Sequence, residues 1–239
     1  RQPESQSGAL PLSYSHHRDG RPRVGRTGRE GTLGQSPPDF QGKMSVPCKI
    51  GALWHGIPMS PALDPDWRPV AFKEWQLVAD AIVAGGQSVL LRKGGISEGK
   101  AGFQWLHGRF FLFPSLFHEQ AEQVAPLPDG SLRSWEPVAG LAEDEVAFSV
   151  YVETIATGRI VDWDEVLLLA PYHIWREEIV RERFEWGEEP GLSWATILAW
   201  RLREPWVLKD RASLGGGWRD RLSAAEAVEP SCGWPEWLI

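Results

Sequence analysis

The 239-residue sequence predicts an α+β domain, in which a mixed or antiparallel sheet carries flanking helices. Apolar residues recur at helical spacing in residues 71–84 and 175–186. They alternate with period two in residues 146–156 and 192–202. The predicted order is helix, strand, strand, helix, strand, two helices and strand, which is typical of this fold class.

The composition is that of a folded protein in an aqueous compartment. Hydrophobic residues make up 42% of the chain and charged residues 24%, which excludes collagen-like, fully disordered and disulfide-scaffold classes. No run reaches the roughly 18 apolar residues of a transmembrane helix, and the basic N-terminus lacks the apolar core of a signal peptide. We therefore expect a cytoplasmic protein without membrane association. Cys48 and Cys232 cannot form a zinc site by themselves, and no cofactor is expected.

The first 58 residues are expected to be a disordered or non-native leader. Residues 1–43 are polar and have almost no apolar periodicity, so they cannot bury enough surface to offset the entropy of ordering. They hold seven basic and four acidic residues, a net charge of +3 in a chain of −7, which leaves −10 for residues 44–239. A basic arm that binds nucleic acid is one alternative. Sequence upstream of a start at Met44 or Met59 is another.

The structured part begins with a predicted helix over residues 71–84. Apolar side chains recur there at helical spacing, with polar ones between them. These apolar residues are Phe72, Trp75, Val78, Ala79, Ile82 and Val83. Gly85 and Gly86 end the helix, because glycine adopts the left-handed conformation without steric cost. A short apolar strand over residues 88–91 follows.

The middle of the chain predicts two further strands around a loop. A strand over residues 109–113 ends at a proline, and a short helix follows over residues 115–124. Residues 125–144 are mostly polar and are expected to form a loop. The clearest strand covers residues 146–156, and its period-two residues are expected on one face. These residues are Val146, Phe148, Val150 and Val152.

Two helices are predicted next. Asp162 can cap a helix through Leu169, with Glu165 completing a capping-box-like pair. A second helix over residues 175–186 has one apolar side, whose two aromatic members are expected to be buried. The residues of this side are Trp175, Ile179, Val180, Arg183 and Phe184.

A strand over residues 192–202 completes the predicted domain. The chain beyond Pro205 is basic and rich in glycine, without a clear period. We therefore expect a single α+β domain over residues 59–204 and an irregular C-terminal extension over residues 205–239.

The densest basic cluster in the acidic body follows the first predicted strand. It consists of Arg92, Lys93, Gly94 and Gly95, with Lys100 close behind. Two glycines after a strand let backbone N–H groups converge beside the two cations, which favours an anion cradle. An exposed hairpin-like turn explains the same residues. The segment matches neither the phosphate-binding loop of nucleoside triphosphatases nor the dinucleotide fingerprint.

Arg92 and Lys93 are the predicted ligand anchors. Their charge opposes that of the surrounding body, and a structural turn would not need both cations. Replacing both with alanine is therefore expected to leave the fold intact, as surface substitutions usually do. The same change is expected to weaken binding of RNA or a nucleotide and to make its salt dependence shallower.

Residues suited to catalysis are scattered along the chain. The possible metal ligands are His107, His118 and Glu119, with Glu98 or His173 as further partners. No pair of them has the spacing of a metallopeptidase helix. Neither cysteine has a local base, and no serine lies in a Gly-x-Ser-x-Gly elbow. We therefore assign no catalytic residue and no metal ligand, and we favour a protein that is not an enzyme.

Four separated motifs occur in order along the predicted domain. They are Phe72-Lys73-Glu74-Trp75, then Leu91-Arg92-Lys93-Gly94-Gly95-Ile96, then Phe111-Leu112-Phe113-Pro114 with His118, and finally His173-Ile174-Trp175 with Arg183-Phe184. Over residues 72–202 this pattern resembles the prokaryotic family called domain of unknown function 1802. That family usually has an acidic residue before the first histidine, whereas Leu106 precedes His107 here. The resemblance implies no established activity and at most an association with nucleic acid.

A weaker resemblance concerns the fold. The order of a helix, a strand ending in a basic glycine segment, a long central strand and a late aliphatic strand is similar to the small barrels of the PUA, ASCH and EVE group. In those domains a cleft beside the first helix and its following strand binds RNA or a modified base. The resemblance implies a PUA-like barrel here with such a cleft. Its expected residues are Arg92, Lys93, Gly94 and Gly95, with His118, Trp175 and Arg183 nearby.

Three hypotheses on function remain open. The first is a non-enzymatic module that binds RNA, a modified base or a nucleotide through cations and aromatic stacking. The acidic body opposes a long polyanion more than it opposes one base or nucleotide. The second is a structural or protein-interaction domain whose tryptophans and acidic surface serve a partner protein. The third is an enzyme acting on nucleic acid or nucleotides, with Lys93, Glu98, His107 and His118 as candidate acid–base groups.

Overall fold

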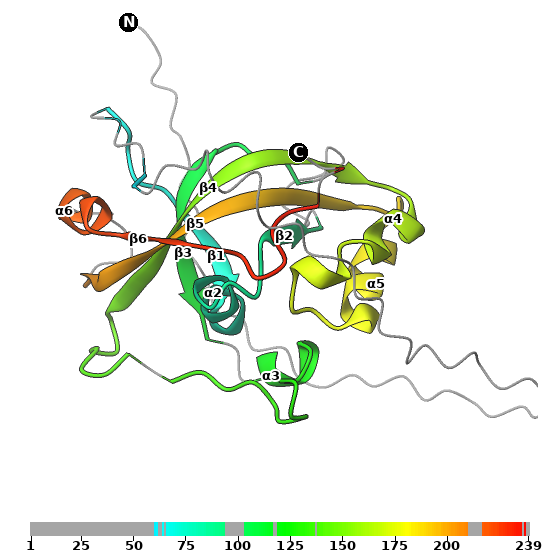
Figure 1. Cartoon of the computed structure of the whole chain (residues 1–239), viewed down its shortest axis with the longest axis horizontal. Coiled ribbons are helices and arrows are strands. Elements are labelled where there is room, and N and C mark those ends of the chain that lie inside the picture. The colour runs from blue at the N-terminus through cyan, green and yellow to red at the C-terminus, as the bar shows by residue number, and fades with distance from the viewer. Residues whose placement is uncertain are drawn as a thin grey trace, which may run out of the picture. The chain divides into compact units, whose positions relative to one another are not determined.

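The fold is seen in a computed structural model (Figure 1). It describes residues 60–61, 64, 66–93, 103–116, 119–136, 138–209, 217–235 and 237. The predicted leader over residues 1–58 lies outside these ranges, and so do Gly94, Gly95, Lys100 and His118.

The described strands form one six-stranded sheet in the order β1-β3-β4-β5-β2, with β6 paired to β5. They are β1 (Ala71–Trp75), β2 (Val89–Arg92), β3 (Arg109–Ser115), β4 (Val146–Ile160), β5 (Leu192–Leu208) and β6 (Glu226–Val228). β1 runs parallel to β3, and every other pair is antiparallel. The long central strands β4 and β5 cross the molecule in Figure 1. The predicted α+β class, with a mixed sheet and flanking helices, is confirmed.

The sheet is open between its two end strands. β1 and β2 lie at the ends of the hydrogen-bonded path, and no ladder joins them among the described residues. The PUA-like barrel that the fold resemblance implied is therefore not closed by backbone hydrogen bonds. Side chains bridge this gap instead, and we call the gap the β1–β2 seam. A guanidinium nitrogen of Arg92 on β2 donates to the carbonyl of Lys73 on β1 at 2.8 Å.

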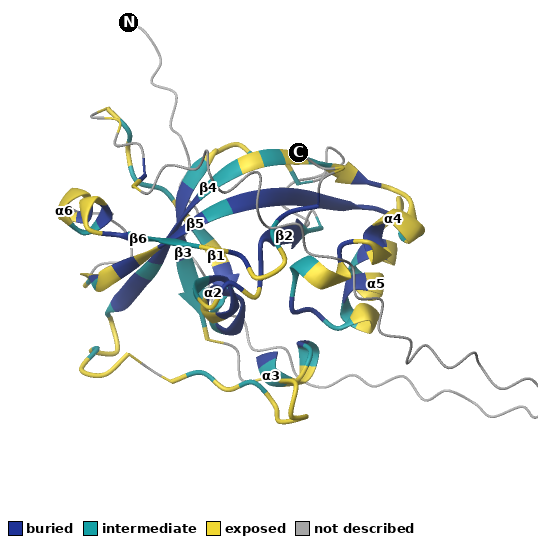
Figure 2. Cartoon of the chain, in the orientation of Figure 1, coloured by how far each residue is buried: buried dark blue, intermediate teal, exposed yellow. Residues whose placement is uncertain are grey.

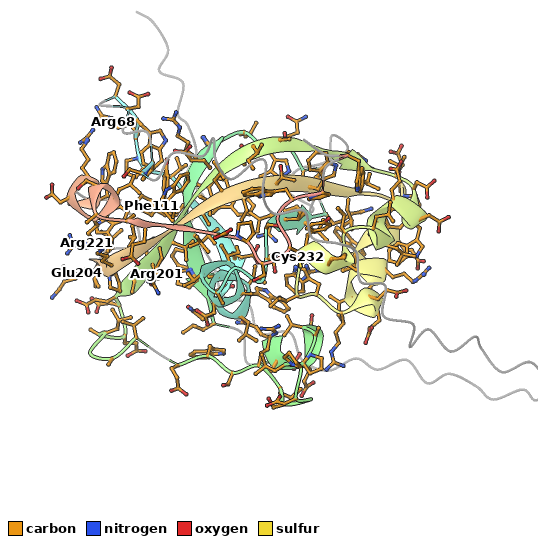
Figure 3. All side chains as sticks on the ribbon, viewed as in Figure 1. Arg68, Phe111, Arg201, Glu204, Arg221 and Cys232 are labelled. Carbon is orange, nitrogen blue, oxygen red and sulfur yellow. The ribbon has the colours of Figure 1, made fainter. Side chains whose placement is uncertain are left out.

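Apolar groups cover both faces of the sheet. Figure 2 shows most of β5 and part of α2 (Gln76–Val83) as buried. Successive residues of β3 point to opposite faces: Phe110 and Leu112 pack in the cluster that contains α2, whereas Phe111, labelled in Figure 3, packs in a second, aromatic cluster. The large side chains of that cluster are Phe111, Phe148, Tyr151, Trp200, Trp206 and Trp218.

A β-bulge divides β4 between the two clusters. The register with β5 shifts between Phe148 and Val150. Val146 and Phe148 therefore belong to the aromatic cluster, whereas Val150 and Val152 belong to the α2 cluster. The expectation that all four residues share one face is wrong, because the pairing with β5 is irregular at this point and the alternation of β4 is not kept across it.

The predicted helix over residues 71–84 is a strand followed by a helix. β1 pairs with β3 from Ala71 to Trp75, and α2 begins only at Gln76. Phe72 and Trp75 stand at helical spacing by chance. Pairing with β3 satisfies the backbone of this segment and overrides the local pattern.

The predicted end of this helix is confirmed. Gly85 has a φ of 73°, in the left-handed region that glycine adopts without strain. Its N–H donates to the Ile82 carbonyl at 2.9 Å, and the N–H of Gly86 donates to the Ala81 carbonyl at 2.7 Å. These two bonds form the Schellman arrangement that satisfies the last carbonyls of a helix.

The strand β3 continues through Pro114, where the sequence predicted its end. The last β3–β4 pair joins Phe111 to Tyr151, so Pro114 lies beyond that ladder. The Phe111 N–H donates to Val70 beside β1, and by alternation the nitrogen of residue 114 turns away from β1. Its missing N–H therefore costs no hydrogen bond. The helix predicted over residues 115–124 is only the single turn α3 (Gln120–Gln123) in the described chain.

The chain beyond Pro205 is not irregular where the structure describes it. β5 continues to Leu208, and β6 pairs with residues 199–201 of β5. Between them α6 (Trp218–Ser223) buries Trp218 and Leu222 in the aromatic cluster. The predicted irregular extension over residues 205–239 is wrong for these elements, which are too short to show a clear period in sequence.

The predicted cap of the fourth helix is confirmed. α4 (Trp163–Leu167) begins after Asp162, whose carboxylate accepts a hydrogen bond from the Asp164 N–H at 2.8 Å. A short 3₁₀ turn, Ala170–Tyr172, follows. The bonded N–H belongs to the second helical residue, so the reciprocal capping box with Glu165 is not the arrangement seen.

The next helix, α5 (Glu177–Glu185), is shorter than predicted but buries the expected side chains. Trp175 is 5% exposed and Phe184 is 6% exposed, which confirms both predictions of burial. Trp175 lies before the helix, in a β-bridge with Val124. Arg183, in the last turn of α5, lies on the same side as these aromatic rings.

Among the described helices, none has both the length and the apolar character required to span a membrane.

Candidate functional site

A pocket of about 300 Å³ lies at the β1–β2 seam. It is lined by Lys73, Glu74 and Trp75 of β1, Leu91, Arg92 and Lys93 at the end of β2, Ser115 of β3, and Trp175 and Arg183 at α5. The carboxyl ends of the parallel strands β1 and β3 meet here. Because the sheet is not closed at this seam, side chains rather than a backbone ladder form the wall.

A buried ion pair holds the floor of the pocket. The Glu74 side chain is 2% exposed, and its Oε2 lies 2.6 Å from an Arg92 guanidinium nitrogen. The other oxygen accepts the Trp75 N–H at 2.9 Å. Arg92 also lies over the ring of Phe72, 4.6 Å from its centroid. The charge of Arg92 is therefore committed to Glu74 and to the joining of β1 and β2.

Gln120 of α3 holds the end of β3 and the start of α2 in place beside this ion pair. It is fully buried, and its side-chain amide donates to the Ser115 carbonyl at 2.7 Å. Its carbonyl oxygen accepts the Leu77 N–H at 3.2 Å. The Ser115 hydroxyl donates to the Glu74 carbonyl at 3.1 Å. These bonds fix the point at which β1 ends and α2 begins. They therefore restrict the positions of Glu74 and Ser115, which line the pocket.

Lys93 is anchored at the C-terminal end of α5. Its ammonium group donates to the Phe184 carbonyl at 3.0 Å and to the Glu189 carbonyl at 2.7 Å. The last carbonyls of a helix have no partner within the helix, and a cation there also complements the helix dipole. Burial lowers the pKa of Lys93, and the nearby charge of Arg159 lowers it further, against an opposing effect of Glu189.

These contacts contradict the premise of one prediction from the sequence. Replacing Arg92 and Lys93 with alanine was expected to leave the fold intact, on the assumption that both are surface side chains. The Arg92 side chain is only 18% exposed and neutralises a buried carboxylate. Lys93 closes the end of a helix. Loss of Arg92 leaves a buried carboxylate without its counter-charge, and loss of Lys93 removes two hydrogen bonds at the end of α5, so the double variant is expected to be destabilised.

Arg183 is a half-buried cation of the pocket that lies against two tryptophan rings. Its guanidinium carbon lies 3.8 Å from the centroid of the Trp175 ring and 5.5 Å from that of Trp75. Among the described residues it makes no hydrogen bond and no ion pair, although a guanidinium carries five N–H donors. Burial lowers its pKa to about 10, helped by the charge of Arg92 and opposed by Glu74 and Glu182. It therefore stays charged at neutral pH.

The two tryptophans of the pocket have different roles. Trp175 is buried, so its ring supports Arg183 and presents no open face to a ligand. Trp75 is half-buried, and its ring meets that of Trp175 edge-on, with 4.6 Å between centroids. The surfaces suited to stacking are thus the Trp75 ring and the guanidinium plane of Arg183.

His173 lies behind the pocket, next to Arg183. Its Nδ1 accepts the Trp175 N–H at 3.2 Å, which requires an unprotonated nitrogen at that position. Burial and, to a smaller extent, the charge of Arg183 together lower the pKa of His173 to about 4. His173 is therefore neutral at physiological pH and positions the Trp175 backbone.

Replacing His173 with asparagine is expected to flatten the acid side of the stability profile. Between pH 6.5 and about 4 the unfolded chain binds a proton on His173 that the native state does not bind. The free energy of unfolding therefore falls as the pH decreases in this window, by at most about 1.4 kcal/mol per pH unit. Asparagine keeps an acceptor but cannot titrate. Urea unfolding of both proteins at pH 7, 5.5 and 4.5 measures the difference, and equal slopes would contradict it.

The pocket is positive in an otherwise acidic chain. Four cationic side chains line it, those of Lys73, Arg92, Lys93 and Arg183, against the single carboxylate of Glu74. The whole chain carries a net charge of −7. A positively charged pocket in a negatively charged protein concentrates the positive electrostatic potential there and attracts small anions.

The structure brings together four of the eight site residues that the sequence suggested. Arg92, Lys93, Trp175 and Arg183 all line the pocket. The other four lie outside the described residues, and their part in the site stays a prediction. They are Gly94, Gly95, Lys100 and His118.

The sequence interpretation missed five lining residues. They are Lys73, Glu74, Trp75, Leu91 and Ser115. Three of them belong to the first motif that carried the family resemblance, which was the available signal. The described residues hold no group of three His, Cys, Asp or Glu side chains arranged to bind a metal ion.

The fold and the site define an α+β domain with a small cationic pocket at the open edge of its sheet. The chain belongs to the family described as domain of unknown function (DUF1802), whose model matches residues 71–223. This range includes all four motifs and extends through α6. No curated protein sequence matches the chain.

Two solved structures are similar to this chain, and both are ASCH proteins from Zymomonas mobilis. The crystal structure of a serine-to-alanine mutant of ZmASCH is 14% identical, with a TM-score of 0.34, and the match covers 56% of this chain and 68% of that chain. The crystal structure of ASCH itself is 15% identical, with a TM-score of 0.33 and the same coverage of 56% and 68%. A likeness at this level carries no argument about the ligand.

Proposed function

We propose that this chain is a binding module for one nucleotide unit, taken as a free nucleotide or as a single base, modified or not, with its phosphate in RNA. The observation that carries the proposal is Arg183. A charged guanidinium lines the pocket without a hydrogen bond or ion pair among the described residues. No nitrogen of Arg183 is among the buried side-chain atoms that lack a partner in the described residues, so its N–H donors are accessible to an anion. A phosphate satisfies a guanidinium with two parallel hydrogen bonds.

The size of the pocket supports a small ligand. Pockets for small molecules have volumes of about 300–1,000 Å³, and this one, at about 300 Å³, is at the lower end. One base stacked on the Trp75 ring, with its phosphate near Arg183, suits that volume. The net charge of the chain supports the same limit, because an acidic body repels a long polyanion more than a single nucleotide.

Replacing Arg183 with alanine is expected to weaken nucleotide binding by about 10- to 100-fold, because a hydrogen bond to a charged group contributes about 1.5–3 kcal/mol. Arg181→Ala is the matched control. It removes the same charge from the same helix, but Arg181 is exposed and pairs with Glu177 and Glu185. The probes are nucleoside monophosphates and a six-nucleotide single-stranded RNA, titrated by tryptophan fluorescence.

Three outcomes of this titration decide the proposal. Weaker binding by Arg183→Ala alone supports it. Equal weakening by both variants reduces the effect to overall charge and removes Arg183 from the site. No binding of any probe by the unmodified protein overturns the proposal and favours the protein-interaction hypothesis.

A further inference from the structure

We infer that the pocket selects a terminal phosphate monoester over an internal phosphodiester. This inference rests on the proposed function and deepens it. A monoester carries close to two negative charges at pH 7 and three unesterified oxygens. A diester carries one charge and has two such oxygens. The choice between the two depends on which cations of the pocket already have partners among the described residues.

Two of the four cations are committed within the described chain. Arg92 is paired with Glu74 at 2.6 Å. Lys93 donates two of its three N–H groups to carbonyls at the end of α5, and these bonds hold its ammonium group in place. Neither can turn toward a ligand without losing these partners.

The other two cations are available to a ligand. Arg183 has no hydrogen bond or ion pair among the described residues, and Lys73 has an exposed ammonium side chain without a partner among them. Arg183 lies against the Trp175 ring, and Lys73 is an exposed residue of β1. Two unpaired positive charges match the two charges of a monoester, and a diester leaves one of them uncompensated.

The shape of a guanidinium favours the same choice. The guanidinium carbon of Arg183 lies 3.8 Å from the centroid of the Trp175 ring, and a guanidinium offers its N–H groups only along the edges of its plane. Paired N–H groups along one edge recognise two oxygens of one phosphate, and a third oxygen of a monoester stays available for a lysine. A pocket of about 300 Å³ also accommodates a terminal nucleotide more readily than an internal RNA segment, whose strand must both enter and leave the pocket.

Three arginines near α6 already have acceptors within the described chain. Figure 3 shows Arg201 and Arg221 at the end of the molecule where α6 lies. Arg201 pairs with Glu226 at 2.6 Å, and Arg203 pairs with the same carboxylate at 3.1 Å. Arg221 donates to the carbonyls of Pro205 and Gly217. These guanidinium groups already have acceptors, which is why the inference concerns the pocket alone.

The test compares ligands that differ by one charge. The probes are adenosine, adenosine 5′-monophosphate, its 5′-methyl diester, the 3′-monophosphate and inorganic phosphate, with the uridine series in parallel. Affinities are measured by calorimetry on the full chain at pH 7.5. We expect at least one monophosphate to bind about tenfold more tightly than its methyl diester, because the extra charge is opposite an unpaired cation.

Protein variants show whether the preference arises at this pocket. Lys73→Gln is expected to reduce the preference for monoester over diester several-fold. Lys209→Gln, an equal change of charge at an exposed residue paired with Glu145 on another part of the sheet, is expected to leave it unchanged. A preference that survives Lys73→Gln intact removes Lys73 from the inference and overturns its charge-matching basis.

The remaining outcomes separate the inference from the proposed function. Equal affinity for monophosphate and methyl diester, both bound more tightly than adenosine, overturns the inference and leaves the proposed nucleotide site standing. Inorganic phosphate binding as tightly as a monophosphate supports selection of the dianion and overturns the proposal that a nucleoside is recognised. Absence of binding by every probe overturns both.

Discussion

Replacing Arg92 with alanine is expected to lower the free energy of unfolding by about 3–5 kcal/mol, the usual cost of removing one partner of a buried ion pair. The variant leaves the Glu74 carboxylate, 2% exposed, without its counter-charge. It also removes the hydrogen bond to the Lys73 carbonyl that bridges β1 and β2. Urea unfolding at pH 7.5, followed by tryptophan fluorescence, gives the difference from the midpoint and slope.

A second substitution tests the cause of that loss. Adding Glu74→Gln to Arg92→Ala removes the uncompensated charge and keeps an acceptor for the Trp75 N–H. We expect the double variant to recover at least about half of the lost stability, because much of the cost is the unpaired charge rather than the lost contact. A loss below about 1 kcal/mol for Arg92→Ala would place this pair among exposed ion pairs of little consequence.

Arg92 and Arg183 line the same pocket but differ in role, so their variants test different properties of the protein. Arg92 holds the two edges of the sheet together, whereas Arg183 makes no hydrogen bond or ion pair among the described residues and is the ligand anchor in the proposed function. Loss of binding in an Arg92 variant would therefore follow from a disturbed seam. This is why Arg183, and not the Arg-Lys pair of the sequence interpretation, is the residue on which a binding test is informative.

The central strands could be predicted from sequence because their residues carry a local signal. The strands predicted over residues 88–91, 109–113, 146–156 and 192–202 are present as β2, β3, β4 and β5, with ends that differ by several residues. Apolar side chains, many of them aromatic, recur with period two in a strand, and this pattern can be recognised in sequence wherever the strand is long enough.

The first strand could not be predicted in this way. β1 has five residues, and what makes it a strand is the parallel pairing with β3, from Ala71 opposite Phe111 to Trp75 opposite Ser115. Those partners lie 40 residues further along the chain. A local pattern of five residues cannot separate a strand from the first turn of a helix when Phe72 and Trp75 fit both.

The bulge of β4 is a second feature that the pattern hides. A period-two run predicts one buried face, but Phe148 and Val150 face different clusters. Both faces of this sheet are covered, so apolar residues are required on either side of the register shift, and the one polar residue there, Ser149, does not break the period-two run. Only the register with β5 reveals it.

The candidate site was predictable in part for a similar reason. Arg92, Lys93, Trp175 and Arg183 stand out locally as cations or aromatic residues in repeated motifs, and the fold brings them to one pocket. Glu74 was hidden inside a segment interpreted as a helix face. Its importance depends on an arginine 18 residues away across the seam, and such a pair carries no mark in the sequence.

Truncating Trp175 or Phe184 to alanine is expected to cost about 3–5 kcal/mol of stability, the range for a large buried aromatic residue. Trp175 is 5% exposed and Phe184 is 6% exposed. The Phe184 ring packs against Trp163, with 5.3 Å between centroids, and Trp175 packs edge-on against Trp75. Loss of either ring opens a cavity between α5 and the sheet that the neighbouring side chains fill only in part.

Trp186→Ala is the matched control for this change. Trp186 follows α5 directly but is 52% exposed, so its loss is expected to alter stability by only about 0.5 kcal/mol. Trp175→Ala is also expected to reduce nucleotide binding, because it removes the surface on which Arg183 rests. Urea unfolding and the nucleotide titration of each variant separate the two effects. If Trp175→Ala kept full stability and lost binding, the ring would belong to the ligand site itself, and the assignment of Trp175 as a buried support for Arg183 would be wrong.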